Sequence, residues 1–477
     1  MCSYAIGGQQ ASLSRNKYGN SIMKLNVVIL AAGKGTRMRS SLPKVLHKLA
    51  DKPLVEHVID TALSLEPEKI IGIFGHGGKL VPKTLSQLDI TWVEQEEQLG
   101  TGHAVDQASH LIDEGLVLVL YGDVPLITAS TLKALIELSR KPNSMGLLTA
   151  ILDDPTGYGR IVRSPDNSVQ KIVEQKDASN DELKIDEVNT GILCAESKQL
   201  TKWLDSLENN NSQGEYYLTD IIEMAVNDGV EVQTHTVSNL WEVEGVNSKI
   251  QLAMLERKHQ LNIADSLLTQ GVTLKDPARI DVRGSLTVGT DVEIDINTIF
   301  EGNVTLGDSV SIGANCIIKN SSIADNTIIH PNSLVENSII GKACEIGPFA
   351  RIRPESVLSS NVKIGNFVEI KKANIANHSK VNHLSYIGDT NMGSNVNIGA
   401  GTITCNYDGA NKHLTEIGND VFVGSSTQLV APVKIGNGAT IGAGSTITKE
   451  VPASELALSR SKQISTPGWK RPTKNKK

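Results

Sequence analysis

Two different rhythms of apolar and polar residues divide the sequence. From Leu25 to about Val246, short continuous aliphatic runs alternate with stretches whose apolar residues recur at helical spacing. Runs of the first kind (LNVVILAAG, KIIGIFG and GLVLVLYGD) are typical of buried parallel strands, whereas LVEHVIDTALSL is typical of a helix. The alternation predicts a doubly wound, Rossmann-like α/β domain whose ligands bind at the carboxyl ends of the strands.

Beyond about residue 271 the apolar residues follow a shorter period. Pairs of an aliphatic residue and a glycine recur six residues apart, as in Leu306-Gly307 and Ile312-Gly313. If six residues form one strand and turn, three such units form one triangular coil, and stacked coils bury a continuous aliphatic column. The spacing predicts a parallel β-helix, and its left-handed sense follows from resemblance to the hexapeptide-repeat family. A longer spacing of 18 residues agrees: Val288 to Leu306, Ile346 to Ile364, Ile417 to Ile435, and Val423 to Ile441.

The two rhythms also predict how the chain is divided. Between them, KIQLAMLERKHQLNIADSLL predicts one amphipathic helix that ends near Gly271. Residues 1–22 lack the apolar segment of a secretory signal, and we expect a disordered extension or a true start at Met23. The other expected segments are an α/β domain (23–248), a linker helix (249–270), a β-helix (271–460) and a basic tail (461–477).

Composition narrows the possible partners. The net charge of −7 argues against binding nucleic acid, and no apolar run is long enough to cross a bilayer. The basic stretch GWKRPTKNKK is either a solvated tail or a local clamp for phosphates. The five cysteines are scattered and lack metal-binding spacing, which indicates reduced thiols in a cytoplasmic protein. We therefore expect small-molecule substrates, no nucleic acid and no membrane insertion.

A glycine-rich loop, LAAGKGTRMRSSLPK, follows the first predicted strand. Gly33 and Gly35 let the backbone approach a ligand closely, and its N–H groups can hold phosphates. The spacing is neither G-x-G-x-x-G nor a Walker motif, so an ordinary strand-to-helix turn stays open on the glycines alone. In YGDVP, Asp123 at a strand end is either a Mg²⁺ ligand or a helix cap. The cations of the loop are Lys34, Arg37 and Lys44.

The motif G-x-G-T-R-M with a following P-K, together with YGDVP, resembles the nucleotidyltransferases that make nucleotide sugars. Further segments follow in order: EQLGTGHA, DDPTGYGRI, IVEQKDA, EVNTGI, NNNSQGEYYLTDII and EVEGVNS. From about Leu25 to Arg471 the chain resembles the bacterial family of bifunctional N-acetylglucosamine-1-phosphate uridyltransferases and glucosamine-1-phosphate acetyltransferases. The resemblance implies acetylation of glucosamine-1-phosphate by acetyl-CoA. Uridylyl transfer from UTP then releases pyrophosphate and gives UDP-N-acetylglucosamine for the bacterial envelope.

The same resemblance assigns residues to the uridylyl site. Arg37 and Lys44 are the implied catalytic cations, and Asp123 and Asn247 the implied Mg²⁺ ligands. The attacking phosphate oxygen is already anionic, so the reaction needs alignment and charge neutralisation rather than a general base. The implied contacts for UTP and UDP-N-acetylglucosamine are Leu30, Ala31, Ala32, Gly33, Lys44, Gln95, Gly100, Thr101, Tyr121, Gly122, Asp123, Gly159, Glu174, Asn189 and Asn247.

The stretch VNHLSYIGD places a histidine, His383, among the β-helix repeats. A lone histidine pointing outward is usually a solvated surface residue. Here the neighbouring coils carry Arg353, Lys371 and Lys372, and NIGAGTITCNYDG interrupts the repeat with a longer loop. Acetylation of an amine requires its neutral form, and imidazole suits the removal of that proton. The resemblance assigns this general base to His383.

The resemblance also implies the substrate contacts of the acetyl site and a homotrimer with that site between subunits. The implied contacts for glucosamine-1-phosphate are Arg353, Lys371, Tyr386 and Asn397. The implied contacts for acetyl-CoA are Ala400, Asn406, Tyr407, Ser425, Ala443 and Arg460, of which Asn406 also positions the sugar.

Two alternative functions compete with this interpretation. Some sugar nucleotidyltransferases carry a β-helix that only assembles the oligomer, and His383 would then be a surface residue. Some subunits of translation exchange factors have the same pair of domains and act as binding scaffolds. The presence of Lys44 and Asp123 argues against a scaffold, and Arg353, Lys371, His383 and Asn406 argue against a single activity.

Overall fold

The computed structural model describes residues 23–33, 35–75 and 78–474, so the expected extension over 1–22 lies outside the described residues. The chain forms two compact units, which meet in sequence between Lys258 and His259. This boundary falls inside helix α7 (Lys249–Thr269). In the part of the chain that the structure describes, no helix has both the length and the apolar character needed to cross a membrane.

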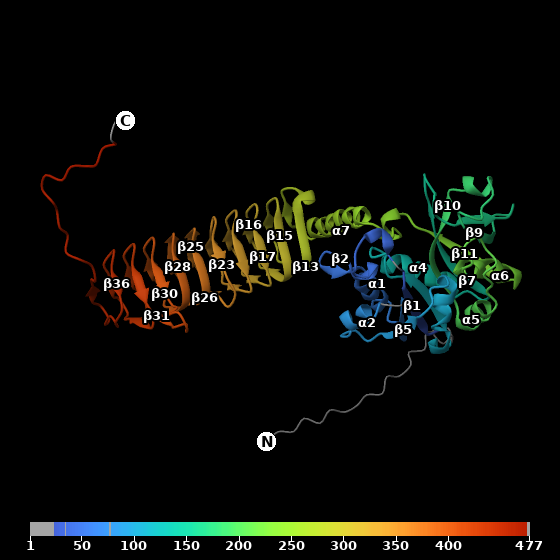
Figure 1. Cartoon of the computed structure of the whole chain (residues 1–477), viewed down its shortest axis with the longest axis horizontal. Coiled ribbons are helices and arrows are strands. Elements are labelled where there is room, and N and C mark those ends of the chain that lie inside the picture. Colours follow the sequence, from blue (N-terminus) through green and yellow to red (C-terminus); the bar gives the residue numbers. More distant parts are fainter. Residues whose placement is uncertain (1–22, 34, 76–77, 475–477) are drawn as a thin grey trace, which may run out of the picture. The chain divides into compact units, whose positions relative to one another are not determined.

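The first unit is built on a mixed nine-stranded sheet (Figure 1). Its central strand β1 (Leu25–Ala31) is buried along its whole length and pairs in parallel with β4 and β6. In contrast, β10 runs antiparallel to β6 and β7. The other strands of this sheet are β4 (Lys69–Gly75), β5 (Thr91–Gln95), β6 (Leu116–Tyr121), β7 (Ser144–Ile151), β8 (Arg160–Arg163), β9 (Val169–Val173), β10 (Glu187–Glu196) and β11 (Glu231–Thr236).

Helices cover both faces of this sheet, as the alternating pattern predicts. Val27 and Ile29 pack with α1 (Leu54–Leu63), α2 (Leu80–Thr84) and α4 (Ala129–Ser139). Val28 and Leu30, which point to the opposite face, pack with α3, α5 and α6. The prediction of a Rossmann-like α/β domain is therefore confirmed. The second group of helices comprises α3 (Thr101–Asp106), α5 (Ser197–Asp205) and α6 (Ile221–Asn227).

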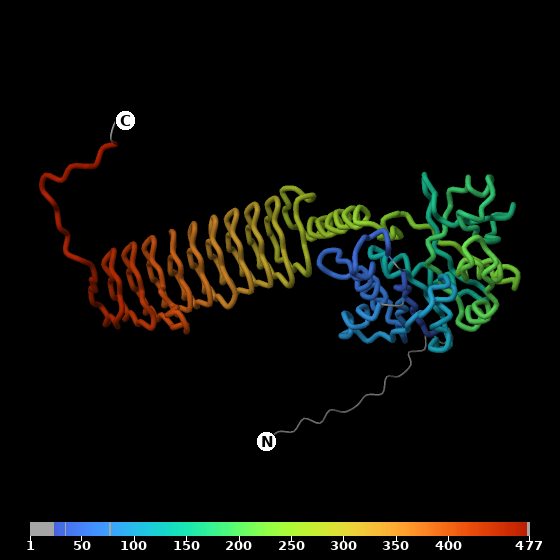
Figure 2. Tube along the Cα trace, in the orientation of Figure 1, coloured from blue at the N-terminus to red at the C-terminus, as the bar shows by residue number. Residues whose placement is uncertain are grey.

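The second unit is a left-handed parallel β-helix of short stacked strands, whose regular coils are visible in Figure 2. All four residue pairs predicted from the 18-residue spacing lie in register on adjacent coils. Other neighbouring coils are 17 residues apart, as between Ile364 and Val381. One step is longer: Asn397 pairs with Phe422, 25 residues away, because an inserted loop bulges out between them.

Two of the sheets in this unit run along the coils. The 11-stranded sheet comprises β12 (Thr273–Leu274), β14 (Glu293–Ile294), β16 (Ser311–Ile312), β19 (Ile328–Ile329), β22 (Glu345–Ile346), β25 (Lys363–Asn366), β27 (Lys380–His383), β29 (Asn397–Ile398), β32 (Phe422–Val423), β35 (Thr440–Ile441) and β37 (Leu456–Ala457). The 15-stranded sheet comprises β13 (Ile280–Val288), β15 (Thr298–Leu306), β17 (Ile317–Lys319), β18 (Ser322–Ile323), β20 (Leu334–Glu336), β21 (Ile339–Ile340), β23 (Arg351–Ile352), β24 (Val357–Leu358), β26 (Glu369–Ile375), β28 (Tyr386–Met392), β30 (Ile403–Cys405), β31 (Thr415–Ile417), β33 (Gln428–Val430), β34 (Val433–Ile435) and β36 (Thr446–Ile447).

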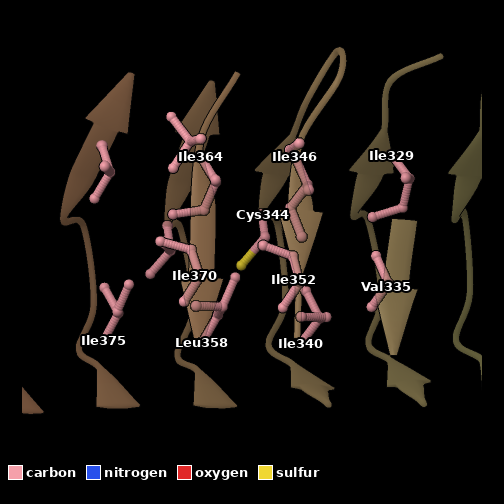
Figure 3. Packing of buried hydrophobic residues seen from close by; sticks show 14 of the residues in the cluster. Ile329, Val335, Ile340, Cys344, Ile346, Ile352, Leu358, Ile364, Ile370 and Ile375 are labelled. Carbon is pink, nitrogen blue, oxygen red and sulfur yellow. The ribbon is translucent and has the colours of Figure 1, made fainter. Parts of the chain in front are cut away.

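An aliphatic column fills the inside of the coils (Figure 3). Ile346, Ile352 and Ile364 point inward from successive strands and are almost fully buried. The core needs few aromatic residues because each coil is too narrow for large rings, which accounts for their low overall share of 4%. The described cysteines are all free, and burial raises the pKa of the Cys316 thiol to about 11.

Helix α7 differs from the prediction in its apolar pattern. Leu255, Ala264 and Leu267 are buried, but several other apolar side chains of this helix are exposed. The helix therefore lacks a single apolar face, because its exposed apolar residues recur on a different side from the buried ones. They are Ile250, Met254, Leu261 and Leu268.

Candidate active sites

A cavity of about 430 Å³ opens in the first unit at the carboxyl ends of β1, β5 and β6. The structure brings ten of the predicted nucleotide contacts to its wall: Leu30, Ala31, Ala32, Gly33, Lys44, Gln95, Gly100, Thr101, Tyr121 and Asp123. The sequence interpretation missed four further lining residues: Val45, Gln98, Ala104 and Glu215. Of these, Gln98 has a local signal, since it lies inside the EQLGTGHA motif.

Lys44 is the centre of the polar part of this cavity. Its Nζ donates to the carboxylate of Asp123 and lies 3.1 Å from Oδ1 of Asn247. The side chains of Lys44 and Asp123 are 12% and 13% exposed, so little water screens this ion pair. Gly33 and Gly35 lie against Lys44, and a Cβ atom at Gly35 would approach the Lys44 Cβ to 2.7 Å. Gly35 also has a φ of 59°, which favours glycine.

The oxygen atoms around Lys44 Nζ form a plausible donor set for a hard cation. The ammonium group stands where the Asp123 carboxylate and the Asn247 amide oxygen converge. Mg²⁺ prefers oxygen ligands and usually keeps several waters and substrate phosphates beside one or two protein ligands. Among the described residues there is no cluster of three or more His, Cys, Asp or Glu side chains that could hold a metal ion. Asp123 and Asn247 thus fit a magnesium ion that is shared with a phosphate substrate.

A set of hydrogen bonds from the start of α7 holds Asn247 in place. The Asn247 backbone N–H donates to the Gln251 side-chain oxygen at 3.0 Å, and the Gln251 amide donates to Glu244 at 3.1 Å. The Val246 N–H donates to the Asp123 carbonyl oxygen at 2.9 Å. These contacts fix the loop that carries Asn247 to the loop that carries Asp123.

The remaining predicted contacts, Gly159, Glu174 and Asn189, form a second group. The Asn189 N–H donates to the Gly159 carbonyl oxygen at 2.9 Å, and a Cβ atom at Gly159 would lie 3.4 Å from the Glu174 carboxylate. Glu174 accepts a hydrogen bond from the Thr219 hydroxyl at 3.1 Å, and burial raises its pKa. This carboxylate lines a separate cavity of about 560 Å³.

Tyr121 connects the two groups. Its side chain is buried, and burial, then the nearby carboxylates of Asp123 and Glu174, raise the pKa of its hydroxyl above the usual value. A Cβ atom at Gly191 would lie 2.5 Å from its ring, so the Tyr121 ring packs against that backbone. The predicted sugar contacts therefore adjoin the cavity that holds Lys44.

Two predicted residues lie elsewhere. Arg37 belongs to a 3₁₀ turn, Thr36–Met38, and its side chain is exposed and outside the cavity wall. Gly122 lies behind the wall, where its N–H donates to the Leu30 carbonyl oxygen and a Cβ atom would lie 3.1 Å from Val55. Close packing explains this glycine, and the catalytic role of Arg37 stays a prediction.

His383 ends strand β27 on the surface of the β-helix. Its Nδ1 lies 3.0 Å from the Oδ1 of Asn366, which occupies the same position one coil earlier. An amide oxygen can only accept, so Nδ1 carries the hydrogen and Nε2 keeps its lone pair. That tautomer leaves Nε2 of the exposed imidazole able to take up a proton. Asn366 was missed from the sequence, although counting one coil back from His383 finds it.

Cationic and polar side chains gather beside His383 on the 15-stranded sheet. The electrostatic partners of Lys371 include Arg353, Tyr386, Asp389 and Lys412, so these groups lie together. The Lys371 Nζ is 3.6 Å from the Asp389 carboxylate, and both side chains are largely buried. Three cations around one carboxylate leave net positive charge, which suits a phosphate ligand. Lys412, from the inserted loop, and Asp389 were missed from the sequence.

Asn406 joins the same cluster. Its amide donates to the Asp389 carboxylate and lies 3.4 Å from the Tyr386 hydroxyl. Asn397 instead lies on β29 in the 11-stranded sheet, and among the described residues no side-chain hydrogen bond joins it to this cluster. One copy of the chain therefore unites Arg353, Lys371, Tyr386 and Asn406, but not Asn397.

Most of the predicted acetyl-CoA contacts follow one edge of the coils beyond His383. The Gly401 N–H donates to the His383 carbonyl oxygen, and Ala400 accepts from the next coil in the same way. Ser425 and Ala443 continue this edge, and the Arg460 guanidinium donates to the Ala443 carbonyl oxygen at 2.8 Å. Tyr407 stands apart on the inserted loop, 61% exposed, and donates to Gly409.

An exposed apolar column runs beside Asn366 and His383. It consists of Phe349, Phe367 and Leu384, which are 49%, 56% and 63% exposed and lie on successive coils. The two phenylalanine rings stack with centroids 5.2 Å apart. Contiguous apolar groups of this kind mark surfaces that associate with another molecule.

Comparison with known proteins agrees with both sites. Family models match residues 27–160 (MobA-like NTP transferase domain), 282–387 (GMPPB C-terminal domain) and 414–449 (bacterial transferase hexapeptide, six repeats). The chain is 58% identical to the bifunctional protein GlmU of Herminiimonas arsenicoxydans over 454 residues, which cover 95% of this chain and 100% of the relative. It is 58% identical, with the same coverage, to the bifunctional protein GlmU of Janthinobacterium sp. (strain Marseille) and to that of Nitrosomonas eutropha.

Proposed function

The chain belongs to the family of bifunctional GlmU proteins, and from this premise we propose that each of its two units carries one of the two transferase sites. The protein is an enzyme of UDP-N-acetylglucosamine synthesis. It acetylates glucosamine-1-phosphate, and it transfers uridylyl from UTP to N-acetylglucosamine-1-phosphate with release of pyrophosphate. The observation that carries the assignment is the pair of separate polar clusters, one around Lys44 and one around His383.

In the first unit the reaction is an in-line displacement at phosphorus. An oxygen of the sugar phosphate attacks the α-phosphorus of UTP, and the bond to pyrophosphate breaks. We assign Lys44 to the triphosphate, because its buried ammonium group can leave Asp123 and neutralise charge that develops on phosphate oxygens. The backbone at Gly33 leaves room for phosphates to approach. Glu174 and Asn189 accept and donate hydrogen bonds to the sugar from the adjoining group.

Asp123 and Asn247 would hold the magnesium ion. When bound, that ion supplies positive charge to the phosphates during the displacement. The role of this chain is to present two fixed oxygen atoms, and Gln251 keeps the Asn247 loop in position for it. The Arg37 side chain is assigned to the outer end of the triphosphate, where an exposed cation can still reach a substrate.

In the second unit the reaction is an acyl transfer to nitrogen. The Nε2 of His383 takes a proton from the 2-amino group of glucosamine-1-phosphate as that nitrogen attacks the thioester carbon of acetyl-CoA. The carbon–sulfur bond breaks, and coenzyme A leaves as its thiolate. Arg353 and Lys371 bind the sugar phosphate, and Tyr386 and Asn406 orient the sugar ring. The edge that carries Ala400, Ser425, Ala443 and Arg460 lies next to His383 and receives acetyl-CoA.

The acetyl site is completed in a homotrimer. His383 and its apolar neighbours are exposed in one copy of the chain, and Asn397 lies away from the sugar cluster. A second copy packed on Phe349, Phe367 and Leu384 would exclude water from the imidazole and bring its own polar groups to the sugar. The free thiols and the small phosphorylated substrates suit a cytoplasmic enzyme.

The test measures the two products separately. Purified protein receives glucosamine-1-phosphate, acetyl-CoA, UTP and Mg²⁺, and both free thiol and pyrophosphate are recorded. We expect His383→Ala to lower thiol release roughly 10²- to 10⁴-fold while pyrophosphate still forms from added N-acetylglucosamine-1-phosphate. Lys44→Ala should lower pyrophosphate release about 10²- to 10³-fold and leave thiol release unchanged. Thiol release at the parent rate from His383→Ala would leave the β-helix as an assembly module only.

A further inference from the structure

The wall of the nucleotide cavity contains a chain of hydrogen bonds with no part in phosphate chemistry. It starts at Gln95, at the end of β5, whose side chain is only 2% exposed. The Gln95 Nε2 lies 3.1 Å from the Gly100 carbonyl oxygen and 3.0 Å from Nδ1 of His103. The other ring nitrogen of His103 lies 3.2 Å from the side-chain amide of Gln107. His103 itself lies behind the cavity wall, in helix α3.

The direction of every bond in this chain can be derived from Gly100. A carbonyl oxygen only accepts, so the NH₂ group of Gln95 must face it. The second N–H of that group then points at Nδ1 of His103, which must keep its lone pair. A neutral imidazole with Nδ1 as acceptor carries its hydrogen on Nε2. This N–H requires an acceptor from Gln107, so the amide of Gln107 is turned with its oxygen toward the ring.

The consequence is a fixed acceptor on the cavity wall. With its NH₂ group held from two sides, Gln95 presents Oε1 to the ligand. Within the described ranges no residue donates a hydrogen bond to this oxygen. A nucleobase with a ring N–H at that place gains a hydrogen bond. A base with a ring lone pair there meets repulsion between two acceptors. Uracil carries a hydrogen on N3, whereas N3 of cytosine is an acceptor.

We propose that His103 is a positioning residue that makes the site prefer uracil over cytosine. It acts through Gln95 and touches no substrate. If Nδ1 were absent, one Gln95 N–H would be buried without a partner, and the reversed amide would set its oxygen against Gly100. Neither orientation would then be satisfied, so the acceptor would no longer be fixed. The proposal rests on the uridylyl transfer assigned above to this cavity.

The test compares UTP with CTP in the pyrophosphate-release assay, with N-acetylglucosamine-1-phosphate and Mg²⁺. His103→Phe keeps a ring near Tyr216, whose ring centroid is 6.3 Å from that of His103, but removes the acceptor. His103→Asn keeps an acceptor, because its Oδ1 occupies the place of Nδ1. The matched control is His110→Phe, the same change at an exposed histidine on the same segment.

We expect His103→Phe to lower the ratio of kcat/KM for UTP to that for CTP about tenfold or more, mainly through the KM for UTP. His103→Asn should keep most of the ratio, and His110→Phe all of it. An unchanged ratio in His103→Phe would overturn the proposal. So would an equal loss in His103→Asn and His103→Phe, because ring packing alone would then explain it. If the parent protein releases no pyrophosphate from any nucleotide, the assigned uridylyl transfer is what fails.

Discussion

The two candidate sites differ in how far apart along the chain their partners lie. In the first unit Lys44 meets Asp123 and Asn247, which are 79 and 203 residues away. In the second unit His383 meets Asn366 across 17 residues, the length of one coil. The α/β fold therefore gathers its site from loops at the ends of separate strands, whereas the β-helix builds its site by stacking neighbouring coils.

The difference extends to burial. Lys44 and Asp123 are mostly shielded within their own unit, so the first site is complete in a single chain. His383 lies on an open surface beside exposed apolar side chains. A catalytic surface made of regular coils has no concave interior, so it needs a second molecule to exclude water. Oligomerisation should therefore matter to one activity and not to the other.

The sharpest way to break this comparison is Phe367→Asp. A charge in the exposed apolar column should dissociate the oligomer and lower thiol release roughly 100-fold or more, because the exposed imidazole then lacks its partner. Pyrophosphate release should stay at the parent level. Asp tolerates the positive φ of 56° at this position, so folding should be preserved. Analytical ultracentrifugation and the two-product assay measure the effect.

Phe367→Leu is the control for this change, since it keeps an apolar side chain and should keep both size and activity. A monomeric Phe367→Asp protein that releases thiol at the parent rate would show that one chain suffices for acetyl transfer.

A smaller effect is expected from Asn366→Leu. This change removes the acceptor that holds the hydrogen on Nδ1 of His383, so the ring can turn or adopt the other tautomer. Thiol release should fall roughly 10- to 100-fold, with pyrophosphate release unchanged. Asn366→Asp retains an acceptor and should retain most of the activity. Equal rates for the parent and Asn366→Leu would mean that the imidazole is oriented by another group.

The smallest effect concerns the stability of the first unit. Burial, then the carboxylates of Glu174, Glu223 and Asp177, raise the pKa of Asp220 to about 6. The unfolded chain, with a carboxyl pKa of about 3.9, releases this proton more readily than the folded chain. Folding stability is therefore lost as the pH rises from about 4 to about 6, and the loss persists above that range.

Asp220→Asn removes this cost. Calorimetry should show an increase of roughly 2–4 °C in the Tm of the first unit at pH 8, and little change at pH 4. The contrasting control is Asp228→Asn, because hydrogen bonds from Lys202 and Trp203 lower the pKa of Asp228. That variant should lose stability at pH 8. The same Tm change for Asp220→Asn at both pH values would exclude titration as its cause.

The comparison of the two units also explains which features the sequence could predict. Coil spacing is a local pattern, so the pairing of Ile346 with Ile364 followed from counting, and the partner of His383 could have been found in the same way. The alternation of strands and helices likewise predicted layers of helices on both sides of the first sheet.

Features that depend on contacts between distant segments could not be derived in this way. Nothing in the local pattern indicates that β10 runs antiparallel, or that Gln251 holds the Asn247 loop. Resemblance placed Arg37 and Asn397 in the sites, but the structure leaves Arg37 on an exposed turn and Asn397 on a different sheet from the sugar cluster. A motif identifies a residue type and its neighbours, whereas its partners depend on the fold.

The coil length has one more consequence, for how this protein can change during evolution. An insertion of one whole coil before Arg351 would leave every later side chain on its original face. An insertion of six residues would turn all later coils by a third of a revolution and carry His383 to a different face from the cations of earlier coils. The length of the second unit can therefore vary only in whole coils, much as a reading frame is kept only when bases are added in threes.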